Sequence, residues 1–153
     1  MNNRTIGWVY VAIQAIVIAV VVLLPGRDDW PTPSWVVLAG GAVVLLGFAL
    51  MAVAALNLGT TLTPTPVPKE SGTLRTDGFY QYVRHPIYVG VITCLAGVTI
   101  RSGSLITLTA AIVAVGFFNA KAQWEEAQLA KKYPEYVDYR ASTPRFVPRI
   151  PRR

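Results

Sequence analysis

Two uninterrupted apolar runs near the N-terminus constrain the fold more than any other feature. They cover Ile6 to Leu24 and Trp35 to Leu58, and each is long enough to cross a hydrocarbon core, which takes about 20 helical residues. The chain is 53% hydrophobic and only 14% charged, unlike a soluble domain. The first run exceeds the roughly 7–15 residues of a signal-peptide core, and no A-x-A cleavage pattern follows it. We therefore predict two retained transmembrane helices, at about 6–24 and 35–58.

Two shorter apolar runs follow, at 87–100 and 105–120. The residues between them, Arg101 to Ser104, are polar or flexible and typical of a turn, so we predict a helical hairpin. Each half is short for a full crossing. Either the hairpin is partly re-entrant or its helices continue beyond the apolar limits. The predicted fold class is all-α: a single integral membrane domain, 1–153, with about four transmembrane helices and a C-terminal helix and tail.

The distribution of Lys and Arg predicts the orientation, because basic residues close to membrane helices are retained in the cytoplasm. With four crossings and a cytoplasmic N-terminus, only Arg27 and Arg101 lie outside. The segments 59–86 and 121–153 and both termini then lie in the cytoplasm, and we expect the membrane to be a bacterial plasma membrane. Anionic lipid headgroups account for the net charge of +6, so no nucleic-acid partner is expected.

The single Cys and the single His exclude several kinds of site. A disulfide within the chain is impossible, and no metal site is expected, because a Cys/His zinc site needs three or four such ligands. Cys94 is interpreted as a small apolar packing residue. Neither a Rossmann fingerprint nor a P-loop occurs, so a nucleotide-like cofactor would have to bind by other means.

The segment between the second run and the hairpin concentrates polar and aromatic groups at the membrane boundary. Three prolines between 64 and 68 remove backbone donors and favour an extended strap. Polar, aromatic and charged residues then run from Leu74 to the start of the next helix at Pro86. This pattern indicates a polar pocket; the alternative is a belt in which Tyr and Arg anchor the helix at headgroup level. Gly90 would allow the close approach of another helix or of a ligand. Helix packing is the more common role of a Gly in a membrane helix.

Residues 119–132 contain no helix breaker and are rich in good helix formers. The last membrane helix is therefore predicted to continue into the cytoplasm until Pro134 stops it. Lys121 and Glu125 share one face of this extension; taken alone, they would form an exposed ion pair of little energetic consequence. The tail after residue 135 carries aromatic residues among Arg and Pro, and we expect it to lie on the membrane or against the strap.

Four stretches in a fixed order carry a family resemblance. They are Leu74 to Gly90, the pair Glu125 and Glu126, then 135–139 and 144–148. Together they resemble the C-terminal signature of the isoprenylcysteine carboxyl methyltransferase family and its phospholipid methyltransferase relatives. The order and spacing are more specific than any single motif, and the two N-terminal spans add a compatible topology.

The resemblance implies a helical membrane fold with S-adenosylmethionine in a pocket at the cytoplasmic face, closed by the C-terminal segment and open laterally to a lipid-like acceptor. The cofactor-contacting positions that it implies are Gly72, Thr73, Leu74, Arg75, Tyr80, His85, Pro86, Ile87, Tyr88 and Glu125. The catalytic candidates are Lys121 and His85. In the isoprenylcysteine enzymes an Arg lies near the substrate carboxylate; here Lys121 keeps the charge but lacks the bidentate fork, which disfavours carboxyl methylation of a prenylated cysteine.

The chemistry of this cofactor fits the residue types present. It carries a sulfonium and an amino-acid zwitterion, so its site needs a carboxylate, hydrogen-bond donors and aromatic faces near positive charge. Glu125 is the candidate for the first role, His85 or Arg84 for the second, and Tyr80 or Tyr88 for the third. A carboxylate acceptor would need no general base. An amine would have to arrive neutral, with His85, a Glu or a Tyr taking its proton.

Two other classes of protein fit parts of the pattern. Membrane sterol and enone reductases, which use NADPH, share a His-Pro-x-Tyr-like element, but they tend to have Asn before the Tyr, where this chain has Ile87. A non-catalytic membrane scaffold explains the spans and charges but not the clustering of motifs. The sequence does not distinguish four kinds of methyl acceptor: a prenyl-thioether carboxylate, a phospholipid amine, a fatty acid and a small hydrophobic thiol. The oligomeric state is open as well.

Overall fold

The computed structural model describes residues 2–68 and 72–149. Positions 69–71 of the predicted strap and 150–153 of the predicted tail lie outside the described residues. The described residues form helices and loops only, which confirms the predicted all-α class. The elements are α1 (Asn3–Leu23), α2 (Ser34–Leu58), the 3₁₀ helices η1 (Gly59–Thr61) and η2 (Gly78–Gln81), α3 (Pro86–Ser102), α4 (Leu105–Lys132) and α5 (Tyr136–Ser142).

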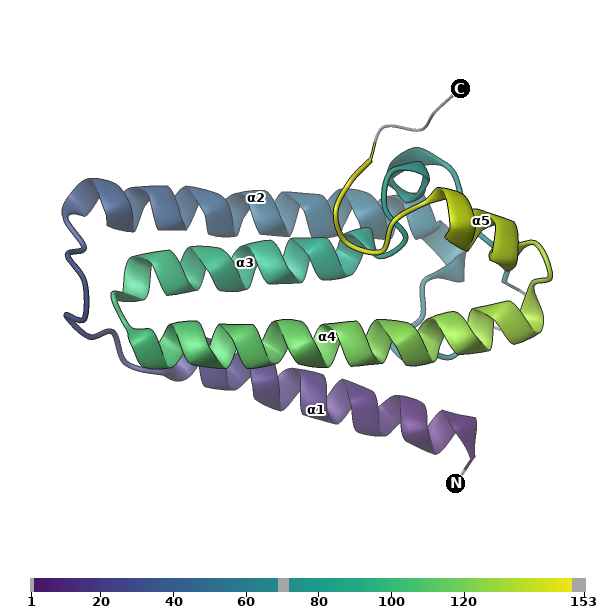
Figure 1. Cartoon of the computed structure of the whole chain (residues 1–153), viewed down its shortest axis with the longest axis horizontal. Helices are drawn as coiled ribbons and strands as arrows, with labels where there is room; N and C mark the ends of the chain where they lie inside the picture. The colour runs from purple at the N-terminus through teal and green to yellow at the C-terminus, as the bar shows by residue number, and fades with distance from the viewer. Residues whose placement is uncertain (1, 69–71, 150–153) are drawn as a thin grey trace.

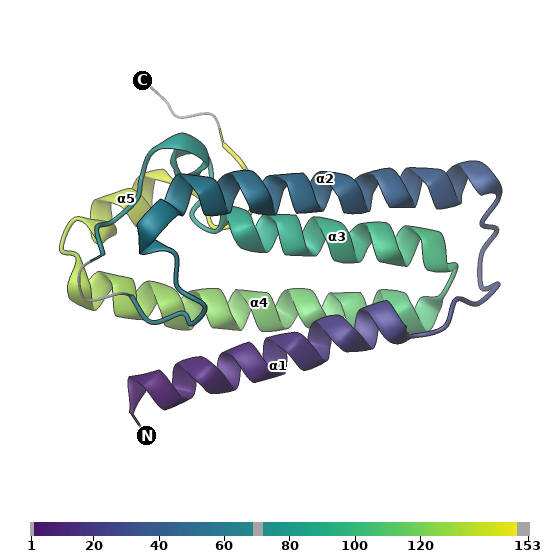
Figure 2. The ribbon, with the colours of Figure 1, turned by 180° about the vertical axis from the view of Figure 1, so that it is seen from behind.

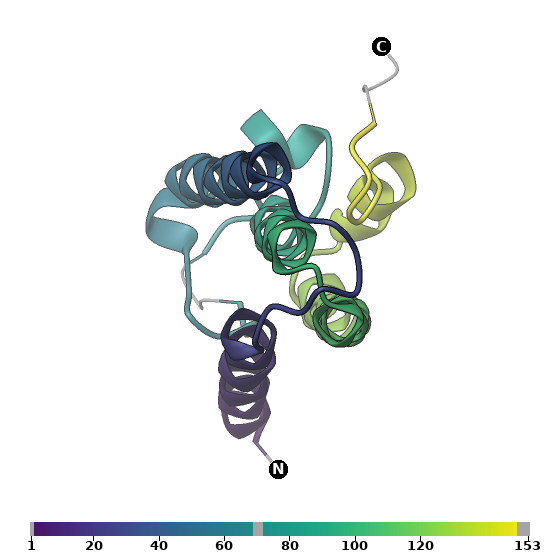
Figure 3. The ribbon, with the colours of Figure 1, turned by 90° about the vertical axis from the view of Figure 1, so that its left-hand side faces the viewer.

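Four long helices lie roughly along one axis (Figures 1 and 2), and α3 lies at their centre, against α2, α4 and α1 (Figure 3). In the described part of the chain, α1, α2 with η1, and α4 are long and apolar enough to cross a membrane. The 17 residues of α3 span about 25 Å at 1.5 Å per residue, less than a hydrocarbon core of about 30 Å. Its bounds nevertheless exceed the predicted apolar run at both ends.

Glycines bring the backbones of α2 and α3 into direct contact along a seam. A Cβ added to Gly90 would lie 2.8 Å from the carbonyl oxygen of Gly47, and one added to Gly97 would lie 2.6 Å from that of Gly40. Small residues at such crossings let membrane helices approach closely and gain van der Waals contact. Gly90 therefore packs two helices together, the first of the two roles expected for it.

The two loops at one end of the bundle are joined to each other. Gly103 ends α3 in the left-handed conformation, with φ of 60°. The amide of Arg27 donates to the carbonyl of Ser102 at 2.9 Å, and the amide of Leu105 donates to the carboxylate of Asp29 at 2.8 Å. These bonds hold the α1–α2 loop to the turn of the α3–α4 hairpin.

The strap, α5 and the tail gather at the other end, where α1 also begins (Figure 1). As predicted, α4 continues beyond its apolar part and ends before Pro134. Sequence analysis did not identify α5. After α5, the amides of Arg84 and His85 donate to the carbonyls of Pro144 and Arg145 at 2.9 and 3.2 Å. The tail thus lies against the segment that leads into α3.

Candidate functional site

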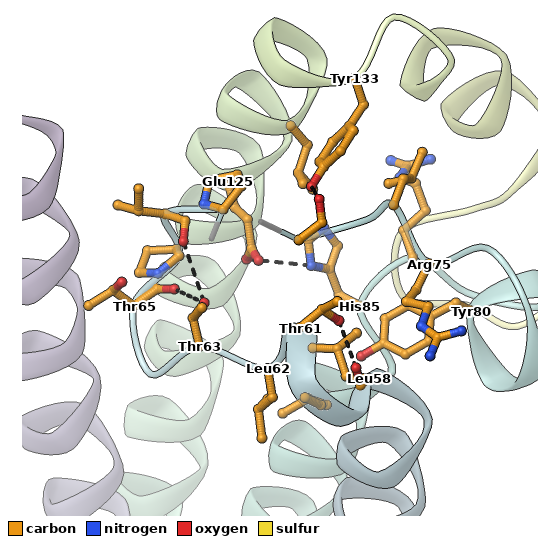
Figure 4. A pocket seen from close by; sticks show the side chains of 18 of the residues that line it. Leu58, Thr61, Leu62, Thr63, Thr65, Arg75, Tyr80, His85, Glu125 and Tyr133 are labelled. Carbon is orange, nitrogen blue, oxygen red and sulfur yellow. Dashed lines mark hydrogen bonds and ion pairs between the residues drawn. The ribbon is translucent and has the colours of Figure 1, made fainter. Parts of the chain in front are cut away.

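A pocket of about 300 Å³ lies at the end of the bundle where the strap and α5 gather. Its walls come from α1, η1, the strap, the start of α3, the extension of α4 and α5 (Figure 4). Of the predicted site residues, the pocket is lined by Gly72, Thr73, Leu74, Arg75, Tyr80, His85, Ile87, Tyr88, Lys121 and Glu125. Pro86 does not line it. This residue begins α3 and is buried, so its contribution is to set the position of its neighbours.

Glu125, His85 and Tyr88 meet at the centre of the pocket. The Tyr88 hydroxyl donates to Glu125 Oε2 at 2.8 Å, and His85 Nδ1 lies 3.8 Å from the same oxygen. Figure 4 shows the carboxylate and the imidazole facing each other. The rings of His85 and Tyr88 are stacked, with centroids 5.2 Å apart. His85 caps α3 and Tyr88 lies in its first turn, so the start of one helix aims both groups at a carboxylate on another.

Lys121 is buried on the side of the pocket that faces α1. Its side chain is not the exposed partner of Glu125 that the four-residue spacing alone would suggest, because the residue is only 3% exposed. The Nζ atom lies 5.1 Å from the centroid of the Tyr88 ring and donates to Oε1 of Gln14. Gln14 is thus a polar pocket residue on a membrane helix, and sequence analysis missed it. A lone Gln in an apolar helix was the available signal, since polar groups inside a bilayer mark function or packing.

Glu126 binds the groups that surround the pocket. Its carboxylate receives two bonds from Arg145, both of 2.9 Å, two from Arg84 at 3.1 and 2.9 Å, and lies 3.2 Å from His85 Nε2. With Nε2 on this carboxylate, Nδ1 of the imidazole is the nitrogen that faces Glu125. Arg145 also donates to Asn119 at 2.6 Å. Sequence analysis noted Glu126 and Arg145 only as members of motifs and assigned neither a role.

Arg84 is unsuited to the role considered for it, binding the carboxylate of a ligand. Its Nε and Nη2 atoms bind Glu126, and its Nη1 atom donates to the carbonyls of Arg140, at 3.0 Å, and Thr143. The guanidinium therefore holds the tail in place. This outcome could not be read from the sequence, since Arg84 and Glu126 are 42 positions apart.

Tyrosines from the C-terminal segment tie the strap to the pocket. The Tyr133 hydroxyl donates to the carbonyl of Gly72, and that of Tyr139 donates to the carbonyl of Tyr80, each at 2.6 Å. Burial, together with the nearby Glu125 carboxylate, raises the pKa of Tyr80 above its ordinary range, so its phenol stays protonated. Arg75 is partly exposed and lies 3.5 Å from Asp77. The wall formed by residues 72–80 is thus held from the C-terminal side.

Together, the fold and the pocket define a class: a helical membrane protein with a pocket of polar and apolar side chains at one end of its bundle. Within the described residues, no group of three His, Cys, Asp or Glu side chains could hold a metal ion. The side chains that line the pocket include one carboxylate, one imidazole, one ammonium, two guanidiniums and several phenols. They are suited to a small polar ligand next to an apolar one.

The chain belongs to the phospholipid methyltransferase family, whose model matches residues 35–136. It is 32% identical over 153 residues to the nickel-cobalt-cadmium resistance protein of Alcaligenes xylosoxydans xylosoxydans, covering 98% of this chain and 67% of the relative. It is 30% identical over 136 residues to protein-S-isoprenylcysteine O-methyltransferase B of Arabidopsis thaliana, covering 86% and 67%. The corresponding Schizosaccharomyces pombe enzyme is 39% identical over 80 residues, covering 51% and 34%. The predicted family and its class of enzyme are thereby confirmed.

A solved structure shares the fold. The eukaryotic intramembrane Ras methyltransferase, isoprenylcysteine carboxyl methyltransferase, superposes with a TM-score of 0.67 at 21% sequence identity. The match covers 95% of this chain and 50% of that protein. Nearly all of this chain thus has the helical membrane architecture of about half of that methyltransferase. The chain spans between a third and two thirds of the length of the relatives above.

Proposed function

We propose that this protein transfers a methyl group from S-adenosylmethionine to a lipid-like acceptor at the cytoplasmic face of a membrane. The observation that carries the proposal is the meeting of Glu125, His85 and Tyr88 inside a pocket that also contains a buried Lys121. Membership of a methyltransferase family supports the reaction class. The names of the isoprenylcysteine methyltransferases among the relatives support a lipid-like acceptor.

The groups in the pocket fit the proposed cofactor. When bound, S-adenosylmethionine supplies an activated methyl group on a sulfonium. Glu125 is the carboxylate available for its amino group, since only Tyr88 is within hydrogen-bond distance of that side chain among the described residues. Tyr80 provides an aromatic face for a cation, because the Tyr88 ring is already stacked on His85 and lies 5.1 Å from Lys121 Nζ. We assign cofactor binding to Gly72, Thr73, Leu74, Arg75, Tyr80, His85, Ile87, Tyr88 and Glu125, with Pro86 positioning its neighbours.

The acceptor is assigned to the side of the pocket that faces α1. Lys121 and Gln14 provide the polar groups there, and apolar helix surfaces adjoin them. In this proposal Lys121 orients the reacting group of the acceptor. His85 holds Nδ1 toward the pocket, where it would take the proton if the acceptor is an amine. A displacement at carbon needs alignment and a dry site more than it needs acid–base chemistry. In this proposal the strap, α5 and the tail cover the pocket, which aligns the reactants and excludes water.

The distribution of charge supports the proposed orientation. Among the described residues, basic side chains gather at the pocket end, in 72–86, the α4 extension, α5 and 143–149, whereas Arg27 and Arg101 lie at the opposite end. Basic ends of membrane helices face the cytoplasm. We infer an integral protein of a bacterial plasma membrane, with both termini and the pocket on the cytoplasmic side.

Calorimetric titration of S-adenosylhomocysteine into detergent-solubilised protein tests the cofactor assignment. We expect the wild-type protein to bind and Glu125→Gln to bind on the order of tenfold or more weakly, because a hydrogen bond to a charged group contributes about 1.5–3 kcal/mol. Glu135→Gln is the matched control, since Glu135 is exposed and does not line the pocket. Thermal unfolding should be unchanged in both variants. Binding of NADPH instead of S-adenosylhomocysteine by folded protein would favour the reductase class.

A further inference from the structure

Three tyrosines at intervals of three residues connect the C-terminal segment to the pocket, and one of them differs from the others. Tyr133 and Tyr139 each donate a hydrogen bond of 2.6 Å to a backbone carbonyl. Tyr136 lies between them, lines the same pocket and is only 1% exposed. Its hydroxyl is buried and has no hydrogen-bond partner within residues 2–68 and 72–149.

A buried hydroxyl without a partner needs a physical explanation, because native proteins pair nearly all such groups. Burial raises the pKa of the Tyr136 phenol above its ordinary range, so the group stays protonated and can donate. Its ring packs edge-to-face against Tyr139, with centroids 5.8 Å apart. The flanking tyrosines are fixed by their own hydrogen bonds. Tyr136 is thus held rigidly with a free donor, an arrangement that lowers the entropic cost of binding a ligand.

The nearby charged groups indicate which part of a ligand would reach this hydroxyl. Arg84 and Arg145 both donate hydrogen bonds to Glu126. Arg84 also donates to a backbone carbonyl, and Arg145 also donates to Asn119. Both guanidiniums are therefore occupied. A cofactor whose amino group binds Glu125 places its carboxylate next to that amino group, and this carboxylate needs a donor. Among the described residues that line the pocket, Tyr136 has a fully buried hydroxyl without a protein acceptor.

We propose that the Tyr136 hydroxyl donates a hydrogen bond to the carboxylate in the amino-acid part of the cofactor. The inference rests on the proposed function and assigns one more group to its site. In this arrangement α5 both covers the pocket and takes part in recognition. Glu125 and Tyr136 would bind the two charged ends of the amino-acid moiety from different helices, so the zwitterion is recognised as a pair of charges.

The test compares Tyr136→Phe with wild-type protein in titrations of two ligands. S-adenosylhomocysteine contains the amino-acid moiety, and 5′-methylthioadenosine lacks it. We expect Tyr136→Phe to raise the dissociation constant for S-adenosylhomocysteine about tenfold, the effect of losing a hydrogen bond to a charged group. The dissociation constant for 5′-methylthioadenosine should not change. Without ligand, Tyr136→Phe should melt at the wild-type temperature or higher, whereas Tyr133→Phe and Tyr139→Phe should melt lower.

Three outcomes would overturn the inference. Equal affinity of wild type and Tyr136→Phe for S-adenosylhomocysteine would show that the hydroxyl does not contact it. An equal loss for both ligands would place the hydroxyl on the nucleoside part. A lower melting temperature of Tyr136→Phe without ligand would show that the hydroxyl already has a protein partner. Failure of folded wild-type protein to bind S-adenosylhomocysteine is a separate result, which removes the proposed function and this inference together.

Discussion

Glu125 and Glu126 are neighbours on α4, yet their surroundings give them different tasks. The Glu125 side chain is 26% exposed, borders the pocket and, within the described residues, receives one hydrogen bond, from Tyr88. The Glu126 side chain is 2% exposed and lies between two guanidiniums and an imidazole. The first carboxylate is free to bind a ligand, whereas the second organises the protein. Because the two residues are consecutive on α4, their side chains point in different directions from the same helix.

Replacing Glu126 should affect stability before it affects chemistry. Glu126→Gln removes the negative charge that Arg84 and Arg145 share, and breaking a buried ion pair from one side costs about 3–5 kcal/mol. We expect a markedly lower unfolding temperature in detergent. Asp77→Asn is the comparison, because Asp77 pairs with Arg75 at the surface, where ion pairs contribute about 0–1 kcal/mol. Similar unfolding temperatures for the two variants would contradict the role given to Glu126.

The site residues that could be predicted from the sequence are those in the contiguous motif and its matching positions. His85, Tyr88, Lys121 and Glu125 all line the pocket. The residues that were missed act across long separations: Gln14 bonds to a residue 107 positions away. Helical periodicity places residues on a face but does not say which face of another helix they meet. Roles that depend on such meetings, as for Glu126 and Tyr136, emerge only from tertiary structure.

At the scale of elements, the apolar runs predicted α1 and α2 to within a few residues, and the absence of helix breakers predicted the extension of α4. The seven-residue helix α5 was missed. Isolated helices of that length are unstable in water, so local sequence carries little signal for them. In this protein α5 is held by tertiary contacts: Tyr136 is fully buried and Tyr139 bonds to the carbonyl of Tyr80.

The α2–α3 seam allows a test with adjacent residues. A Cβ at Gly40 would lie 2.8 Å from the carbonyl oxygen of Gly97, whereas one at Gly41 would have nothing within 4 Å. We expect Gly40→Ala to lower the free energy of unfolding by about 1–3 kcal/mol through overpacking. Gly41→Ala should leave it unchanged or raise it by up to about 1 kcal/mol, since Ala favours the helix. Thermal unfolding in detergent measures both, and equal effects would contradict direct packing of the two backbones.

At the scale of the whole molecule, the bundle separates two functions along its axis. One end, where the α1–α2 loop is bonded to the α3–α4 turn, is structural. At the other end the strap, α5 and the tail gather (Figure 2). The pocket with its charged and phenolic side chains lies there. The order of apolar runs and basic residues predicted this architecture. The closing of the pocket by the tail depends on the Glu126 cluster, which local patterns do not encode.

In the function proposed for this protein, the pocket transfers methyl groups from S-adenosylmethionine to a lipid-like acceptor. The most direct test of this transfer is to supply a radiolabelled methyl donor to membranes that contain the protein and to measure label in the organic-solvent extract. Membranes with wild-type protein should incorporate label, and those with Glu135→Gln should match them, whereas Glu125→Gln should lose most of the signal. Labelling by Glu125→Gln at the wild-type level, or no labelling above protein-free membranes by folded wild type, would contradict methyl transfer by this pocket.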